Sequence, residues 1–598
     1  MPDIQKEPFN VICGVLGTYL FCYSFVSYLL KDRLYISEAC TASPGFTLYA
    51  FFFKCCRLLV YKQKLKSLFP IVLSLLVGLI VSTYAADIAH PHSYVSAGPN
   101  HPDTAQRLEH ATLDFCRLAL SVQVCFTGAQ LPRKYARFHW RSLLILLGPG
   151  MVGMWMMSTL LVWAIVRVPG KNNDSETTMP FLQALAVAAC ITPTDPVLSN
   201  TIVRGRWADR HVPVPMTQLI SAESGANDGL GYPFLYLALY LLKYLGTQGY
   251  QGAAGAGGSA GHWGGAKSAM GMWFGETWGY LVLMGAVWGV FVGWLARRCL
   301  KVAVALGYTS QENLYTLTVV ISVGPPNPWI SLPTLYGTLI LCLIFYSALP
   351  YWQCTFMEVS KPQNMAINSL MNDLAYSCLS GWFQSETRDD SFEPAVDMLL
   401  NMSFFVWFGV VCPWPLFSSS FVPLWRLAVL AVTILLLRRP LILLLLYKRL
   451  GPVHQPRQAL FMGFFGPIGV SAVFYQHEMM EFLRTQVKGH DGEARQDAQT
   501  LSELVRVIVW FVVLSSVVVH GLSIPIYQCC LCLVRHFIPG AAEGLSVRDI
   551  IRNEKQYILS RPWVSELEGD LEGQLRSFAR PRPPFRRLRF ERDEEAQS

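Results

Sequence analysis

The chain has 598 residues, of which 52% are hydrophobic and only 15% are Asp, Glu, Lys or Arg. Soluble domains carry roughly 25% charged residues, so this composition excludes an ordinary soluble enzyme, as does the mean hydropathy of +0.34. The formal net charge is +8, and its placement in the chain is more informative than its size.

Apolar runs of membrane-spanning length recur along the whole chain. Examples lie at 11–30, 142–166 and 504–527, and runs of about 20 residues are what a bilayer-spanning helix needs. We expect an all-α polytopic membrane protein with about 12 to 13 transmembrane helices. We assign residues 1–535 to this membrane domain and 536–598 to a basic, largely disordered tail.

Basic residues between the apolar runs predict the orientation. They cluster at 133–141, 204–210, 297–301 and 448–457, and basic loops face the cytoplasm. The alternation then places the glycosylation sequon that begins at Asn173 outside and the C-terminal tail inside. The basic residues of the tail indicate a segment near anionic lipid, and we expect no nucleic-acid site.

The first polar interruption lies within 185–203, "LAVAACITPTDPVLSNTIV". Pro193 and Pro196 each lack a backbone donor and disturb the carbonyl four residues earlier. Freed carbonyls are costly in hydrocarbon unless a polar group uses them. Asp195 lies inside this break beside Thr194, so an unwound helix would direct carbonyl and carboxylate oxygens to one point, which suits a small cation.

The second polar interruption is "SAESGANDGLG" at 221–231. On a helix, Ser224 and Asp228 are four residues apart and share a face, and so do Glu223 and Asn227. The two carboxylates of this segment can therefore serve different neighbours.

The third interruption places Arg438 and Arg439 in the middle of the apolar run 430–447. A buried arginine costs from a few to more than ten kcal/mol unless it is paired. Glu223 is the anion that we expect to pair with one of them. The aspartates of the first two interruptions then have no fixed cation partner, and a buried carboxylate can exchange a proton for a metal ion.

A second broken hydrophobic segment follows at 460–475, "LFMGFFGPIGVSAVFY". Gly466, Pro467 and Gly469 are its helix-breaking residues. Broken helices in corresponding positions of two halves predict an inverted-repeat transporter with crossed discontinuous helices and a site at the membrane midplane.

Three further polar residues follow this segment. We expect His477 and Glu478, at the end of a span, to be interfacial, with His477 able to sense pH. We expect His520, on an apolar run, to be a packed neutral histidine.

These motifs resemble the fungal plasma-membrane Na+/H+ antiporters of the cation:proton antiporter superfamily. The similarity is carried by "ITPTDPVLSNTIVRGRWADRHVP", "LISAESGANDGLGYPFLYLAL" and "RQALFMGFFGPIGVSAVFY". It implies a secondary antiporter of the plasma membrane, a homodimer with a scaffold and a mobile core, and alternating access. It implies no cofactor, with Na+, Li+ or K+ and H+ as transported ions.

The resemblance also implies roles for single residues. Asp228 would carry both the cation and the proton, and Asp195, Thr194 and Ser224 would line its site. Glu223 would pair with an arginine of the RRP segment, for which we favour Arg439 because it precedes Pro440. Asn227 places the chain in the Asn-Asp subgroup, which implies one-for-one exchange. The fungal branch leaves this stoichiometry open. The sequence does not decide between Na+ and K+.

Two stretches, 42–68 and 323–368, depart from the family pattern and differ in composition from their flanks. We interpret one or both as unspliced intron sequence or a gene-model error. If they are real, they change the topology and could disable transport.

Two other functions remain as alternatives. An intramembrane diaspartyl protease would use Asp195 and Asp228 as a pair that shares one proton. The residues that flank Asp195 and Asp228 differ from those that flank the catalytic aspartates of such proteases. A cation channel would show repeated pore segments or an acidic ring, and the sequence has neither.

Overall fold

The structure is a computed structural model of the 598-residue chain. It describes residues 69–91, 104–130, 135–169, 176–196, 198–199, 212–246, 265–284, 392–419, 422–488 and 495–537. The segments 42–68 and 323–368, and the tail after residue 537, lie outside the described residues.

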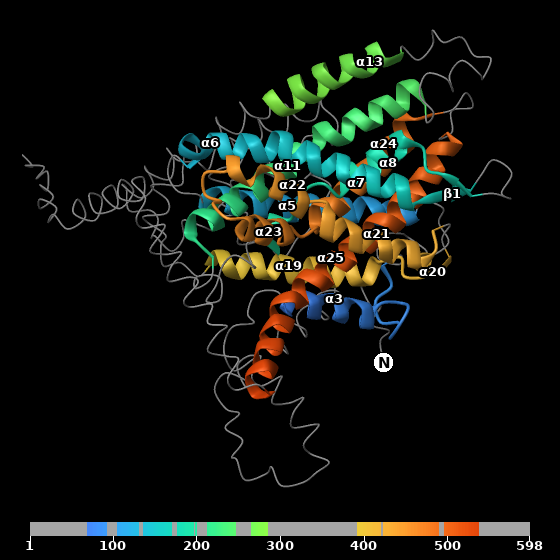
Figure 1. Ribbon diagram of the computed structural model, residues 1–598. Helices are drawn as coiled ribbons and strands as arrows, with labels where there is room; N and C mark the ends of the chain where they lie inside the picture. Colours follow the sequence, from blue (N-terminus) through green and yellow to red (C-terminus); the bar gives the residue numbers. More distant parts are fainter. Residues whose placement is uncertain are drawn as a thin grey trace, which may run out of the picture. The chain divides into compact units, whose positions relative to one another are not determined.

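The described part of the chain is helical almost throughout, as the apolar runs predict (Figure 1). The helices of the first half are α3 (Phe69–Val81), α5 (Thr104–Gln130), α6 (Tyr135–Ile145), α7 (Met151–Ile165), α8 (Phe181–Cys190), α11 (Val214–Leu245) and α13 (Gly265–Met272). Wide π-helical turns follow α6 (Leu146–Gly150) and α13 (Trp273–Met284).

The helices of the second half are α19 (Phe392–Val411), α20 (Leu416–Ser419), α21 (Leu424–Leu437), α22 (Pro440–Leu446), α23 (Pro456–Phe464), α24 (Val470–Gln486) and α25 (Gln496–Phe537). The short 3-10 helix Tyr447–Arg449 follows α22. Strands β1 (Arg167–Pro169) and β2 (Glu176–Thr178) pair antiparallel, with Val168 opposite Thr177. This hairpin flanks the loop that contains the sequon.

Three helical stretches in the described residues are long and apolar enough to cross a membrane: Phe138–Ile165, Leu424–Arg449 and Gln496–Ser523. Other apolar helices are shorter, among them Phe181–Cys190. Ten residues of α-helix rise about 15 Å, which is half of a hydrocarbon core of about 30 Å. Helix α8 is therefore a half-helix, and the chain must continue beyond its break to complete the crossing.

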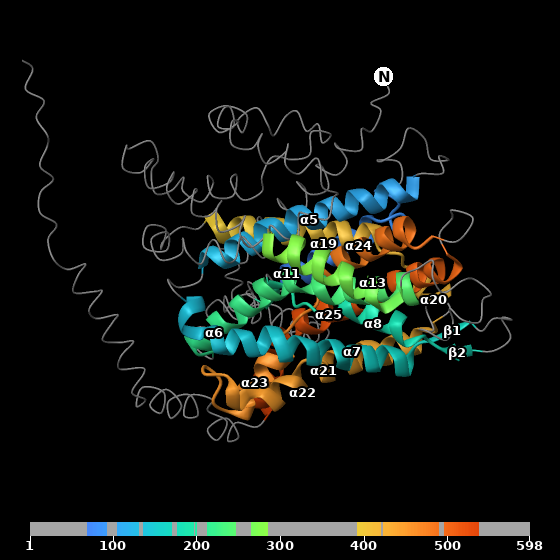
Figure 2. The ribbon, with the colours of Figure 1, turned by 90° about the horizontal axis from the view of Figure 1, so that it is seen from above.

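Two sets of helices meet around α5. Helix α19 packs along α3 (Figure 1), and α5 contacts α19 (Figure 2). On its other side α5 contacts α24 and α11, and α11 contacts α8. The close α3–α19 contact depends on glycine, because a Cβ on Gly409 would lie 2.6 Å from the Leu75 carbonyl oxygen.

The predicted residues of both helix breaks are confirmed as lying between helices, with one difference at Pro196. Helix α8 ends at Cys190, and α23 and α24 are separated by residues 465–469. Pro196 does not lie inside the break but begins the next helical turn. The first turn of a helix tolerates proline because its N–H groups have no intrahelical acceptor there.

Candidate ion-binding site

The two helix breaks cross and bond to one another. The backbone N–H of Asp195 in the first break donates to the carbonyl oxygen of Pro467 in the second, at 2.9 Å. Four half-helix ends therefore meet at one buried point, two of them N-termini and two C-termini.

Asp195 stabilises the N-terminal ends at this crossing. Its Oδ1 accepts the backbone N–H of Leu198 at 2.9 Å, and its Oδ2 accepts that of Val470, the first residue of α24, at 2.9 Å. Helix N-termini present unsatisfied N–H groups and a partial positive charge, which a carboxylate complements. The sequence predicted no fixed cation partner for Asp195 and did not predict these two backbone N–H donors.

Arg438 stabilises the C-terminal ends of the crossing. Its Nη1 donates to the carbonyl oxygen of Ile191 and lies 3.4 Å from that of Thr192, and its Nη2 donates to that of Gly466 at 2.8 Å. We expected a small cation to use the freed carbonyls. A guanidinium bonds to them instead, because its forked donors reach carbonyls on two segments at once.

Helix α25 also bonds to the second break, which the sequence did not predict. The Ser516 hydroxyl accepts the Ile468 N–H at 2.8 Å, and His520 Nε2 lies 2.8 Å from the Phe464 carbonyl oxygen. His520 therefore contacts the unwound backbone and is not simply packed among apolar side chains.

A chain of hydrogen-bonded side chains joins the first break to α11. Asn227 Nδ2 donates to Thr194 Oγ1 at 2.8 Å, and the Thr194 N–H donates to Asn227 Oδ1 at 3.1 Å. Thr194 Oγ1 donates to Ser224 Oγ at 3.2 Å, which in turn donates to Ser199 Oγ at 3.3 Å. All four side chains are buried. The structure thus brings together three predicted site residues and adds Ser199.

Asp228 lies on the next turn of α11 after Ser224 and is 4% exposed. The hydroxyl of Tyr475 on α24 donates to its backbone carbonyl oxygen. The backbone of Asp228 therefore contacts α24, and the preceding residue, Asn227, bonds to Thr194 in the first break. Tyr475 was not singled out from the sequence, because one aromatic residue in an apolar helix carries no distinguishing pattern.

Arg439 is the arginine that contacts Glu223. Its Nη2 lies 2.6 Å from Glu223 Oε2, and both side chains are 1% exposed. This ion pair joins α11 to the start of α22. Both charged groups are buried, and each compensates the charge of the other.

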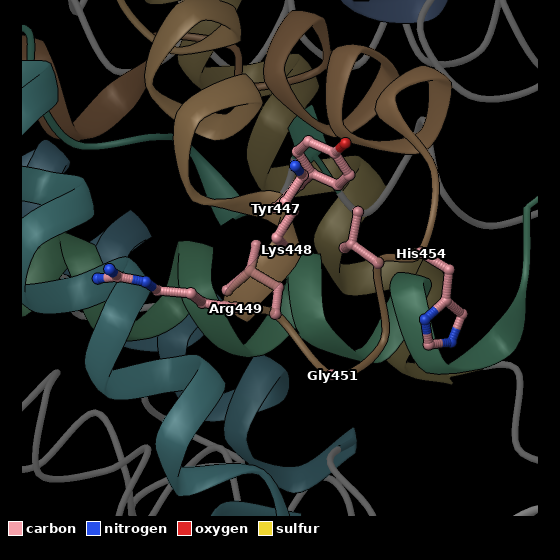
Figure 3. Close-up of a pocket in the computed structure, with 7 residues that line it drawn as sticks. Tyr447, Lys448, Arg449, Gly451 and His454 are labelled. Carbon is pink, nitrogen blue, oxygen red and sulfur yellow. The ribbon is translucent and has the colours of Figure 1, made fainter.

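Figure 3 shows a pocket of about 480 Å³ in the described residues, lined by Tyr447, Lys448, Arg449, Leu450, Gly451, Val453 and His454. Arg449 and His454 point in different directions there. None of the candidate ion-site residues lines it. The ion site is thus a packed crossing of helices and is separate from this pocket.

Comparison with known proteins shows which family the chain belongs to. The family model for the transmembrane part of sodium/hydrogen exchangers matches residues 48–342 and 374–528. The chain belongs to the sodium/hydrogen exchanger family. This exchanger family match includes both helix breaks and the whole of α11.

Curated relatives agree with the family. A probable Na(+)/H(+) antiporter of Schizosaccharomyces pombe is 30% identical over 88% of this chain and 56% of its own length. A second S. pombe Na(+)/H(+) antiporter is 28% identical over 76% of this chain and 83% of its own. The chain spans about half the length of the first relative.

A solved structure shows the same fold. The sodium proton antiporter MjNhaP1 from Methanocaldococcus jannaschii has a TM-score of 0.50 at 15% identity, covering 88% of this chain and 99% of its own. The expectation of an all-α antiporter fold is confirmed.

The family match bears differently on the two atypical stretches. It runs through residues 48–68, most of the first stretch, and omits 343–373, which overlaps the second. The interpretation of one or both as unspliced intron sequence or a gene-model error stays a prediction.

Two further residues that the sequence singled out lie on α24. His477 and Glu478 are buried within the protein on α24, at 6% and 4% exposure, whereas their position at the membrane interface stays a prediction. Glu478 pairs with Arg117 on α5. No signal in the sequence links residues 361 positions apart, so only the packing of α5 on α24 shows this pair.

Proposed function

We propose that this chain is a secondary transporter of the plasma membrane that exchanges Na+, Li+ or K+ for H+. Its membership of the exchanger family and the names of its relatives support this function. The chain also carries two helix breaks. In transporters with discontinuous helices, the ion site is formed at such breaks by backbone and side-chain oxygens.

The observation that carries the proposal is the position of Asp228. It is a buried carboxylate on α11, one turn after Ser224 and next to Asn227, at the crossing of two interrupted segments. Oxygen atoms are the ligands that hard cations prefer. Thr194, Ser224 and Asn227, which are hydrogen-bonded to one another, offer hydroxyl and amide oxygens on the same helix turns and the adjoining break.

The other buried charges of the site have structural roles. Asp195 accepts two backbone N–H groups, and Glu223 pairs with Arg439. We therefore assign exchange to Asp228, whose carboxylate binds either a proton or a metal ion, and we assign to Asp195 the support of the crossing. Net exchange follows when the site opens to one side of the membrane at a time.

The two alternatives have less support. A diaspartyl protease needs two carboxylates that share a proton, whereas both oxygens of Asp195 accept backbone N–H groups. A cation channel needs a continuous path, whereas the described site is a closed crossing of buried side chains.

We also propose the membrane arrangement. The basic loops and the C-terminal tail face the cytoplasm, and the protein forms a homodimer, as the family resemblance implies. Residues 1–535 form the exchanger domain, and 536–598 form the cytoplasmic tail.

The test is exchange in vesicles that contain the purified full chain and an imposed pH gradient. Added Na+ should dissipate the gradient with the wild-type chain, and Asp228→Asn should lose this activity. Asp114→Asn, at a half-exposed aspartate of α5, is the matched control and should keep it. Equal exchange by Asp228→Asn would exclude the carrier role, and a cation current without a proton gradient would indicate a channel.

A further inference from the structure

A second buried ion pair joins α5 to α24, away from the crossing. Arg117 Nη2 donates to Glu478 Oε1 at 2.6 Å, and the two side chains are 10% and 4% exposed. Arg117 Nη1 also contacts Asp114 within α5, at 3.1 Å. A buried pair adds little stability over an apolar pair of the same size, and a switch is among its best-attested uses.

Aromatic rings connect this pair to Asp228. Tyr475 bonds to the carbonyl of Asp228, and its ring lies 5.3 Å from that of Tyr232, one turn after Asp228 on α11. On α24, Glu478 lies one turn after Tyr475. The two rings therefore lie on the turn of α11 that follows Asp228 and on the turn of α24 that precedes Glu478.

The Arg117–Glu478 pair lies toward the C-terminal ends of α11 and α24. Glu478 follows Tyr475 along α24, and the C-terminal ends of α11 and α24 meet where Lys243 Nζ donates to Gln486 Oε1 at 3.1 Å. The basic loop at 204–210 precedes the other end of α11. Since basic loops face the cytoplasm, the pair is on the outward side of Asp228.

Further charged side chains lie beyond the pair. Glu109 of α5 contacts Arg484 of α24 at 3.6 Å and also contacts Arg506 of α25. His110 lies 3.8 Å from Glu481. Helices α5 and α24 are thus joined by several charges on this side, of which Arg117–Glu478 is the most buried.

The pair also joins two sets of helices with different relations to the site. The site residues described above come from the first break and the turn after it, from α11, and from the second break and α24. Helix α5 contacts α19, which packs on α3, and none of these three contributes a side chain to the crossing. Any movement of the site helices along α5 must separate Arg117 from Glu478.

We propose that Arg117 and Glu478 are positioning residues that form the outward gate of the transporter. When they are paired, they hold α24 and α11 against α5, and the rings of Tyr232 and Tyr475 close the route from Asp228 to the outside. When they separate, the site opens outward. This inference rests on the proposed exchange function.

The test compares Glu478→Gln with Asp114→Asn, since each removes one carboxylate from Arg117. Only the first breaks the contact between helices. Weakening the closed state should increase the outward-open population. In oriented vesicles, the half-saturating Na+ concentration of Glu478→Gln should fall about threefold or more at the outward face and rise at the inward face. Asp114→Asn should leave both values unchanged.

If Glu478→Gln does not fold, a second variant tests the same proposal. Arg117→Leu/Glu478→Leu removes both charges and leaves no unpaired one, and it should shift the two half-saturation values in the same directions. Unchanged values at both faces in a folded variant would overturn the gate.

Amide hydrogen exchange in lipid nanodiscs gives a readout that does not need transport. The gate variants should exchange faster in peptides from 229–242 and 471–486, and at the wild-type rate in peptides from 71–81. If the gate variants exchange amide hydrogens at the wild-type rate in all of these peptides, or faster by the same factor in all of them, the gate is overturned. If vesicles with the wild-type chain show no Na+-driven movement of H+, the proposed function is overturned instead, so the two failures are distinguishable.

Discussion

Asp195 and Arg438 stabilise opposite ends of the interrupted helices. The carboxylate accepts N–H groups at the N-terminal ends, and the guanidinium donates to carbonyls at the C-terminal ends. Each side chain thus complements both the unsatisfied backbone groups and the partial charge of the ends that it meets. In the proposed exchange, the ion is therefore not needed to hold the crossing together and can bind and leave.

At the residue scale, we predict that Glu223→Gln lowers stability. It leaves the guanidinium of Arg439 buried without its carboxylate, at a cost of about 3 to 5 kcal/mol. Thermal unfolding in detergent should show a lower midpoint and a lower folded yield. The double variant Glu223→Gln/Arg439→Met should recover part of the loss, and an unchanged midpoint for the single variant would contradict the pairing.

Thr194→Val tests the hydrogen-bonded chain. Valine keeps the shape of threonine but removes the hydroxyl that accepts from Asn227 and donates to Ser224. We expect a folded protein with weaker Na+ binding, because one oxygen of the site is lost. The half-saturating Na+ concentration in vesicles measures this, with Thr433→Val on the exposed side of α21 as a control.

At the element scale, the two half-helices can cross only where their backbones approach closely. A Cβ on Gly469 would lie 2.9 Å from the Cβ of Asp195 and still closer to its carboxylate oxygen. Glycine is thus required at the N-terminal end of α24, whereas the backbone bond from Asp195 to Pro467 fixes the relative position of the breaks.

We therefore predict that Gly469→Ala pushes the breaks apart and lowers both stability and exchange. Gly271→Ala on α13 is the matched control, since nothing lies within 4 Å of its added Cβ. Alanine also favours a helix over glycine by about 1 kcal/mol, so the control should be neutral or slightly stabilising. Similar unfolding temperatures for the two variants would show that the close approach is not required.

At the scale of the whole molecule, the proposed exchange couples one carboxylate to movement between two sets of helices. The two breaks, α11 and α24 carry the candidate site, and α5 contacts α11 and α24 as well as α19, which packs on α3. In the proposed mechanism H+ and the cation compete for Asp228, so that each translocation carries one or the other.

Competition predicts the direction of the pH dependence. Raising the pH removes the proton from Asp228, so the half-saturating Na+ concentration should fall as pH rises and should level off once the carboxylate is ionised. On the acid side the change should approach tenfold per pH unit for one proton. Exchange rates measured at several Na+ concentrations and pH values would check this, and a half-saturation value independent of pH would contradict a shared carboxylate.

The sequence by itself determined the fold class, the two helix breaks and the placement of Asp228, Asn227 and Ser224 together on one buried helix, because apolar runs and polar interruptions in them are local patterns. It also identified Glu223 as the partner of a buried arginine, since a membrane-buried charge needs a counter-charge. Only the tertiary structure decided that Arg439 fills this role, that Asp195 and Arg438 bond to helix ends, and that Arg117 meets Glu478. These outcomes depend on which distant segments cross, and crossing is a property of the packed helices that no local pattern encodes.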